Sequence, residues 1–263
     1  MTYLSRRGGF FRVLLVTHVG GVALLALVAL ALDDVPGPSA AQAAALAGLG
    51  AVGLAAYAGF YRALELGPIA IVSPIASSNG SIVVLLAVLV LGESLTGLQA
   101  LGCLLVFGFV VLAALEPKPG PDGTERGSGI PLAVGTAASF GAYLFGLATL
   151  SDELGWLVPI LVARSVTVAI VAAVAVARPP AGASLGRLAL LGCLAAGMLD
   201  ATGYLVFNRG AEIGEVAITS AAAAAYPVIP IVVGLVALRE RVATHQLVGV
   251  AGVLCGMVVL ALG

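Results

Sequence analysis

Two charged residues lie inside long apolar runs of this sequence and are its first candidates for chemistry. Arg164 lies eight residues into the run at 156–177, and Asp200 lies eight residues before the end of the next run, 187–208. If these runs are consecutive antiparallel helices, both side chains lie about 12 Å from the same end, at about 1.5 Å per residue. The matching depths predict an ion pair. Either the pair is structural, or Arg164 binds an anionic group of a ligand, or Asp200 takes up a proton.

Asp200 also begins a polar stripe. Asp200, Tyr204 and Asn208 are spaced i, i+4 and i+8, so a helix would present them on one face. The stripe indicates the wall of a polar cavity that reaches inward to Asp200. Tyr57, a tyrosine in an earlier run, is a further candidate for contact with a ligand.

Polar residues also lie near the centres of two other apolar runs. Asn79, with Ser77 close by, is near the centre of one run, and Tyr226 is near the centre of the other. Both runs contain proline, namely Pro74 in the first and Pro227 and Pro230 in the second. Proline removes a backbone hydrogen bond, so both helices are predicted to be interrupted near these residues. The carbonyl groups left without a partner could then accept hydrogen bonds from neighbouring side chains or from water in a polar cavity.

Two further runs add single candidates. Tyr143 shares a helix face with Thr136 and Ser139 in the run 130–150. His18 lies near the depth of Arg164 in the first run, and its imidazole could exchange a proton near neutral pH. The alternative for His18 is a hydrogen-bonded packing residue.

The composition determines the class of protein that holds these residues. Of the 263 residues, 61% are hydrophobic and 10% are charged, whereas about 25% are charged in a typical soluble domain. The net charge of -1 gives no basic field for nucleic acid. Cys103, Cys193 and Cys255 lie apart in apolar runs, which indicates reduced packing residues, with neither a disulfide framework nor a metal site.

Nine apolar runs are long enough to cross a hydrocarbon core of about 30 Å as helices. They are 12–32, 43–63, 68–91, 96–115, 130–150, 156–177, 187–208, 215–238 and 243–262. The polar stretch 116–129 reads as a linker. The glutamates at helix ends, Glu65, Glu93, Glu212 and Glu240, are expected to be solvated. The chain is therefore predicted to be an all-α polytopic membrane protein.

The sequence repeats itself at an offset of 147 residues. Residues 57–115 align without a gap to 204–262, with 18 of 59 positions identical. The matched pairs include Tyr57/Tyr204, Arg62/Arg209, Glu65/Glu212, Glu93/Glu240 and Gln99/Gln246. The run 130–150 has no counterpart, so the halves contain four and five helices. Because five is an odd number, two consecutive repeats of five helices would enter the membrane in opposite senses. This is the inverted-repeat architecture of secondary transporters, whose substrate binds near the midplane where the repeats meet.

The chain resembles the EamA-like transporters of the drug/metabolite transporter superfamily. The resemblance is carried by "LGE" at 91–93 and "LRE" at 238–240, each followed by glutamine and a glycine-rich helix. It implies two inverted repeats, 1–115 and 130–263, joined by the linker 116–129. The family has ten helices, and the first of them has no equivalent in this sequence, so nine are expected; either the start codon is placed too late or the chain is a nine-helix member.

The resemblance implies a secondary transporter, not an enzyme, that exports a small organic metabolite without a cofactor. Nine-helix relatives that move magnesium leave divalent-cation transport as the alternative. An intramembrane enzyme is less favoured because no catalytic motif is present, and a membrane scaffold because the apolar runs contain polar residues and prolines near their centres. The expected substrate contacts are Asn79, Tyr226, Asp200, Arg164, Tyr204, Tyr57, Tyr143 and Ser77. Asp200 and His18 are the candidates for proton coupling.

The basic residues predict how the chain is oriented. Ten of the twelve Lys and Arg residues fall on the face that carries the linker 116–129. Basic loops stay in the cytoplasm, so the linker is predicted inside, in a multi-pass protein of the inner (plasma) membrane.

Overall fold

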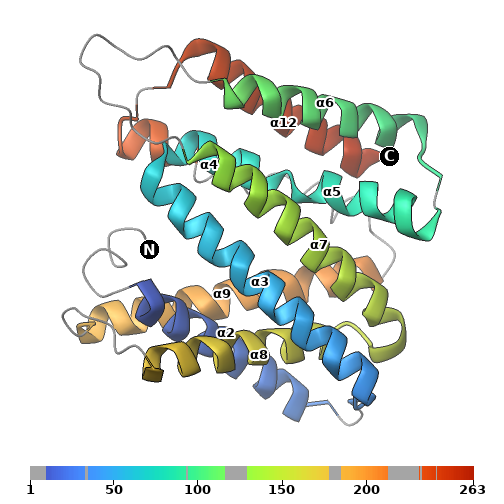
Figure 1. Ribbon diagram of the computed structural model, residues 1–263, viewed down its shortest axis with the longest axis vertical. Helices are drawn as coiled ribbons and strands as arrows, with labels where there is room; N and C mark the ends of the chain where they lie inside the picture. The colour runs from blue at the N-terminus through green and yellow to red at the C-terminus, as the bar shows by residue number, and fades with distance from the viewer. Residues whose placement is uncertain are drawn as a thin grey trace. The chain divides into compact units, whose positions relative to one another are not determined.

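The computed structural model describes residues 10–32, 35–92, 94–115, 129–177, 185–212, 231, 233–240 and 242–263. Every regular element within these ranges is helical (Figure 1). The helices before the linker are α2 (Phe10–Leu30), α3 (Ala40–Leu66), α4 (Ile69–Ser77), α5 (Asn79–Leu86), the π-helical turn η1 (Ala87–Leu91) and α6 (Gly97–Ala114). Those after it are α7 (Ile130–Leu154), α8 (Val158–Ala177), α9 (Arg187–Glu212), the π-helical turn η2 (Val233–Ala237) and α12 (Thr244–Leu262).

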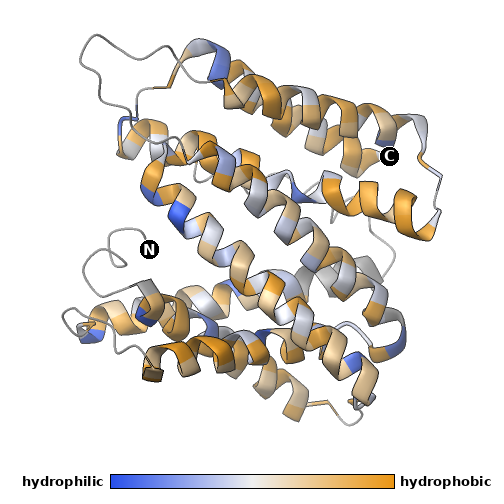
Figure 2. Ribbon diagram, in the orientation of Figure 1, coloured by the Kyte–Doolittle hydropathy of each residue, from blue (hydrophilic) through white to orange (hydrophobic). Residues whose placement is uncertain are grey.

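Eight helical segments among the described residues are long and apolar enough to cross a membrane. They coincide with eight of the nine predicted runs, and apolar residues dominate them in Figure 2. The ninth run, 215–238, lies mostly outside the described residues. The all-α polytopic fold class is confirmed.

Local sequence explains several helix ends. Thr96 accepts a hydrogen bond from the backbone N–H of Gln99, and the Gln99 side chain accepts one from the N–H of Thr96, which forms a capping box at the start of α6. Ser39 and Gln42 exchange the same pair of bonds at the start of α3. Gly155, with φ of 71°, follows α7 in the left-handed conformation that glycine favours.

The described chain forms two compact units, and each contains helices from both sequence repeats. Unit 1 comprises Met1–Leu54 and Gly146–Glu212, and unit 2 comprises Ala55–Phe145 and Ile213–Gly263. In unit 1, α2 packs against α8 and α9. The 147-residue offset relates α2 to α8. The division into repeats at the linker stays a prediction.

Unit 2 shows the repeat as a symmetric helix contact. Its helices α6 and α12 lie side by side (Figure 1) and are related by the same offset. A Cβ atom on Gly102 would lie 2.6 Å from the backbone nitrogen of Leu260, and one on Gly249 would lie 2.5 Å from that of Ala113. Gly102 corresponds to Gly249 and Ala113 to Leu260. Two glycines thus bring the helices together at equivalent points, as small residues do in membrane interiors.

The predicted interruption of the run 68–91 is confirmed. Helix α4 ends at Ser77, α5 begins at Asn79, and Pro74 lies inside α4. The break is therefore at Ser78 and not at the proline. The corresponding prolines, Pro227 and Pro230, lie outside the described residues.

Candidate functional site

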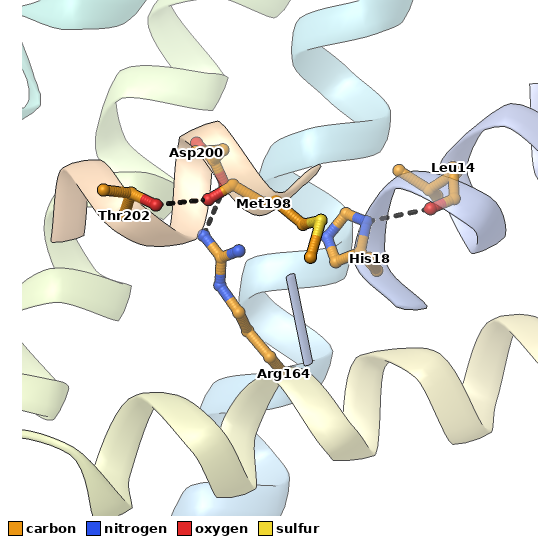
Figure 3. A network of polar contacts seen from close by, with 6 residues as sticks. All are labelled: Leu14, His18, Arg164, Met198, Asp200 and Thr202. Atoms are coloured by element: carbon orange, nitrogen blue, oxygen red, sulfur yellow. Dashed lines mark hydrogen bonds and ion pairs between the residues drawn. The ribbon is translucent and has the colours of Figure 1, made fainter. Parts of the chain in front are cut away.

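The Arg164–Asp200 pair expected from the matching depths is present in unit 1. Arg164 extends from α8 and its Nη2 donates to Oδ2 of Asp200 on α9, at 2.5 Å (Figure 3). The arginine side chain is 2% exposed, whereas the aspartate side chain is 43% exposed. The buried guanidinium is therefore covered by protein, while the carboxylate forms the accessible side of the pair.

Other groups hold the guanidinium in place. Its central carbon lies 4.9 Å from the centroid of the Tyr204 ring, within the range of a cation–π contact. A Cβ atom on Gly21 of α2 would lie 2.8 Å from Nη1 of Arg164. The absence of a side chain at Gly21 thus lets α2 approach the arginine. Tyr204 joins Asp200 on one face of α9, as the polar stripe predicted; the side chain of Asn208 lies outside the described part of the structure.

His18 lies on α2, three residues before Gly21 and on the same helix face. Its side chain is buried, and its Nδ1 donates to the backbone carbonyl of Leu14 at 3.0 Å (Figure 3). Because a carbonyl oxygen only accepts, Nδ1 carries a proton. The hydrogen bond agrees with a packing role for His18, and its proposed part in proton coupling stays a prediction.

The residues predicted around the interrupted helix lie in unit 2. The Asn79 amide donates to the carbonyl of Ala76 at 3.3 Å, and the Ser78 hydroxyl donates to that of Ile75 at 2.7 Å. Two carbonyl groups at the break are thereby satisfied by neighbouring side chains. Ser77 is buried next to them.

The tyrosines predicted for unit 2 pack within it. Tyr57 on α3 meets Phe140 on α7 edge to face, with ring centroids 4.9 Å apart and an interplanar angle of 87°. Tyr143 on α7 is buried. The buried hydroxyls of Ser81 and Thr136 have no hydrogen-bond partner among the described residues.

The structure thus brings together one part of the predicted site in each unit. Arg164, Asp200, Tyr204 and His18 belong to unit 1. Asn79, Ser77, Tyr57 and Tyr143 belong to unit 2. Tyr226, predicted as the counterpart of Asn79, lies outside the described residues. The roles of all of these residues in binding stay predictions.

The prediction that Glu240 is solvated is wrong. Its carboxylate is partly buried, with Oε1 accepting from the N–H of Ile69 at 2.8 Å and Oε2 from that of Ala70 at 2.9 Å. It caps the start of α4, where Pro68 offers no side-chain cap. The proline before α4 and the repeated glutamate of the "LRE" motif were the sequence signals for this contact.

Comparison with known proteins agrees with the fold. The chain matches the EamA-like transporter family over residues 1–115 and 127–262. No match was found among curated proteins. A solved crystal structure of a protein is similar to it with a TM-score of 0.65 and 20% identity, covering 96% of this chain and 88% of its own. That likeness concerns the fold alone. The family match spans both repeats, and the chain therefore belongs to the EamA-like transporter family, whose members are membrane transporters of the drug/metabolite superfamily.

Proposed function

We propose that this protein is a secondary transporter that exports a small organic metabolite across the inner (plasma) membrane by alternating access. Membership of the EamA-like family and the eight apolar helices support transport through a multi-pass protein. The proposal assigns substrate contact to Asp200 and Tyr204 in unit 1 and to Asn79 and Ser77 in unit 2.

The observation that carries this proposal is the unequal exposure of the Arg164–Asp200 pair. Asp200 lies inside the membrane-spanning segment Arg187–Leu205, and its side chain is 43% exposed. A carboxylate exposed to hydrocarbon inside a membrane is costly, and such residues usually face the helix bundle interior or a water-filled cavity. The exposure of Asp200 therefore favours a wet path beside α9, along which a polar solute can move.

The arrangement also favours Asp200 over Arg164 as the group that meets the substrate. The guanidinium is covered by Asp200, the Tyr204 ring and the backbone of Gly21, so a ligand reaches the carboxylate first. We propose that Arg164 keeps Asp200 in place and that Asp200 contacts the polar part of the solute or a coupling proton.

A thermal-shift screen of the purified protein tests the substrate class. A ligand that binds only the folded state raises the apparent stability, by about 2.7 kcal/mol at one hundred times its dissociation constant. We expect a small organic metabolite to raise the unfolding temperature in the presence or absence of Mg²⁺. Stabilisation by divalent cations alone would favour the magnesium-type alternative and contradict the organic substrate.

A further inference from the structure

The start of the interrupted helix is held by a residue from a distant part of the chain. The first N–H groups of a helix have no partner within the helix, and an anion is favoured there by the helix dipole. Glu240 supplies both bonds, to Ile69 at 2.8 Å and to Ala70 at 2.9 Å, from a position about 170 residues later. The two contacts join the segment before α12 to the N-terminus of α4 inside unit 2.

The segment that carries Glu240 is shaped to present its carboxylate. Directly after η2, the N–H of Glu240 donates to the carbonyl of Gly234 at 2.9 Å. Arg239 adopts φ of 51°, a conformation that is unfavourable for a residue with a side chain. A Cβ atom on Gly234 would lie 2.5 Å from Oε2 of Glu240 and 2.9 Å from the nitrogen of Ala70. The contact therefore depends on glycine at position 234.

The contact acts on the helix that leads to the break. Helix α4 runs for nine residues from Ile69 to Ser77, about 13 Å at 1.5 Å per residue. Asn79 begins the next helix directly after the break at Ser78. A change at the start of α4 is therefore transmitted by one short helix to the residues proposed to contact the substrate.

We propose that Glu240 is a releasable latch: its two hydrogen bonds hold the start of α4 closed on one membrane face, and their release opens a path from that face to the break at Ser78. This inference rests on the proposed alternating access. Glu240 acts through α4 and is a positioning residue.

Cysteine labelling tests the latch without any substrate. The reporter is Ser73→Cys in a protein whose three native cysteines are replaced by serine; Ser73 lies one turn after Ala70 and is 2% exposed. A water-soluble maleimide is added to reconstituted protein from the face that carries the linker 116–129. Glu240→Gln keeps the shape of the side chain but loses its charge and one acceptor oxygen. We expect it to raise the labelling rate about tenfold, since it removes the charge that strengthens both hydrogen bonds to the start of α4.

A second variant opens the latch while Glu240 is intact. Gly234→Ala places a methyl group against Oε2 and is expected to raise the labelling rate as Glu240→Gln does. Gly108→Ala, whose Cβ would meet nothing within 4 Å, is the matched control. It is expected to leave the rate within about twofold, because the added methyl group meets no neighbour.

Two results would overturn the latch. One is a labelling rate unchanged by both Glu240→Gln and Gly234→Ala. The other is an equal rise at a second reporter, Val106→Cys, which lies in the buried contact of α6 with α12 and outside the cluster around α4; such a rise would show general loosening. Since labelling needs no substrate, a protein that passes this test but transports no metabolite contradicts the proposed function and leaves the latch intact.

Discussion

Unit 1 contains the same helix crossing twice, and the polar side chains near the two copies differ. Helix α3 crosses α8 at Gly50, where a Cβ atom would lie 2.6 Å from the carbonyl oxygen of Ala163. Helix α9 crosses α2 at Gly197, which is Gly50 plus the repeat offset, and there a Cβ atom would collide with the carbonyl oxygen of Thr17. Each crossing thus joins one helix from each repeat through an equivalent glycine.

The residues around the two glycines differ. At the α3–α8 crossing, the Thr167 hydroxyl donates to the carbonyl of Gly50 at 2.9 Å. At the α2–α9 crossing, Gly20 occupies the position equivalent to Thr167, and the Arg164–Asp200 pair lies beside the contact. The repeat equivalents of Arg164 and Asp200 are Thr17 and Gly53, so the first repeat has no such pair.

This difference separates the requirements of the fold from those of function. Close packing at glycine is present in both crossings, so packing accounts for the glycines. The Arg164–Asp200 pair joins α8 to α9 and is part of neither glycine contact, so the packing of these two crossings does not account for it. We infer that the pair serves a purpose other than these two contacts, which adds support to assigning it to transport.

The largest expected effect comes from removing the buried cation. Arg164→Ala should lower the free energy of unfolding by about 3 kcal/mol, since it leaves Asp200 without its cation inside the membrane. Thr17→Ala, at the equivalent position, should cost about 1 kcal/mol or less. Thermal unfolding in detergent measures both. Equal losses of stability in the two variants would show that Arg164 matters no more than Thr17. Recovery of expression in Arg164→Ala/Asp200→Ala would show that the loss comes from leaving Asp200 without its cation.

A smaller effect is expected at the two crossing glycines. Gly50→Ala and Gly197→Ala should each destabilise the protein by about 1–3 kcal/mol, because the added methyl group meets backbone of the partner helix. Gly48→Ala lies on the same helix as Gly50 and meets nothing within 4 Å, so it should be neutral or stabilise by up to about 1 kcal/mol. A neutral result at only one of the two crossing glycines would show that the contacts are not equivalent.

The smallest effect is expected from the hydrogen bond that only the α3–α8 crossing has. Thr167→Val removes the hydroxyl that donates to Gly50 and should cost about 1 kcal/mol. Thr167→Ser keeps the hydroxyl and is the control. Chemical denaturation of the two variants compares them, and a valine variant as stable as the serine variant would show that this bond contributes nothing to the crossing.

The sequence predicted the features that depend on helix order and length. The depths of Arg164 and Asp200 follow from counting residues along consecutive antiparallel helices, and the pair formed as expected. Eight of the nine apolar runs were found as spans for the same reason. The placement of Asp200 and Tyr204 on one face of α9 was predicted for a similar reason, because helical periodicity determines which residues share a face.

Features that depend on contacts between distant segments were not predicted. Helices of one sequence repeat pack against helices of the other, as α2 does against α9. Which helices pack together depends on where glycines allow close contact, and the 147-residue offset does not reveal it. The break at Ser78 instead of Pro74 reflects side chains that bond to the carbonyls of Ile75 and Ala76, a local competition that a proline count misses. The Glu240 contact joins residues about 170 positions apart, where periodicity carries no information.

Counterflow in proteoliposomes tests the central claim that Asp200 serves transport and not packing. The probe is the metabolite that most raises the unfolding temperature of the wild-type protein, and the variant is Asp200→Asn. Thr202→Ala is the control, since its hydroxyl donates to the Met198 carbonyl of its own helix. Asp200→Asn keeps an oxygen that can accept from Arg164 but removes its counter-charge, so we expect it to lower the free energy of unfolding by up to about 3 kcal/mol. Per folded protein, we expect it to lose at least about tenfold in transport rate, equivalent to about 1.4 kcal/mol, while Thr202→Ala transports normally. Wild-type counterflow in Asp200→Asn would contradict the account.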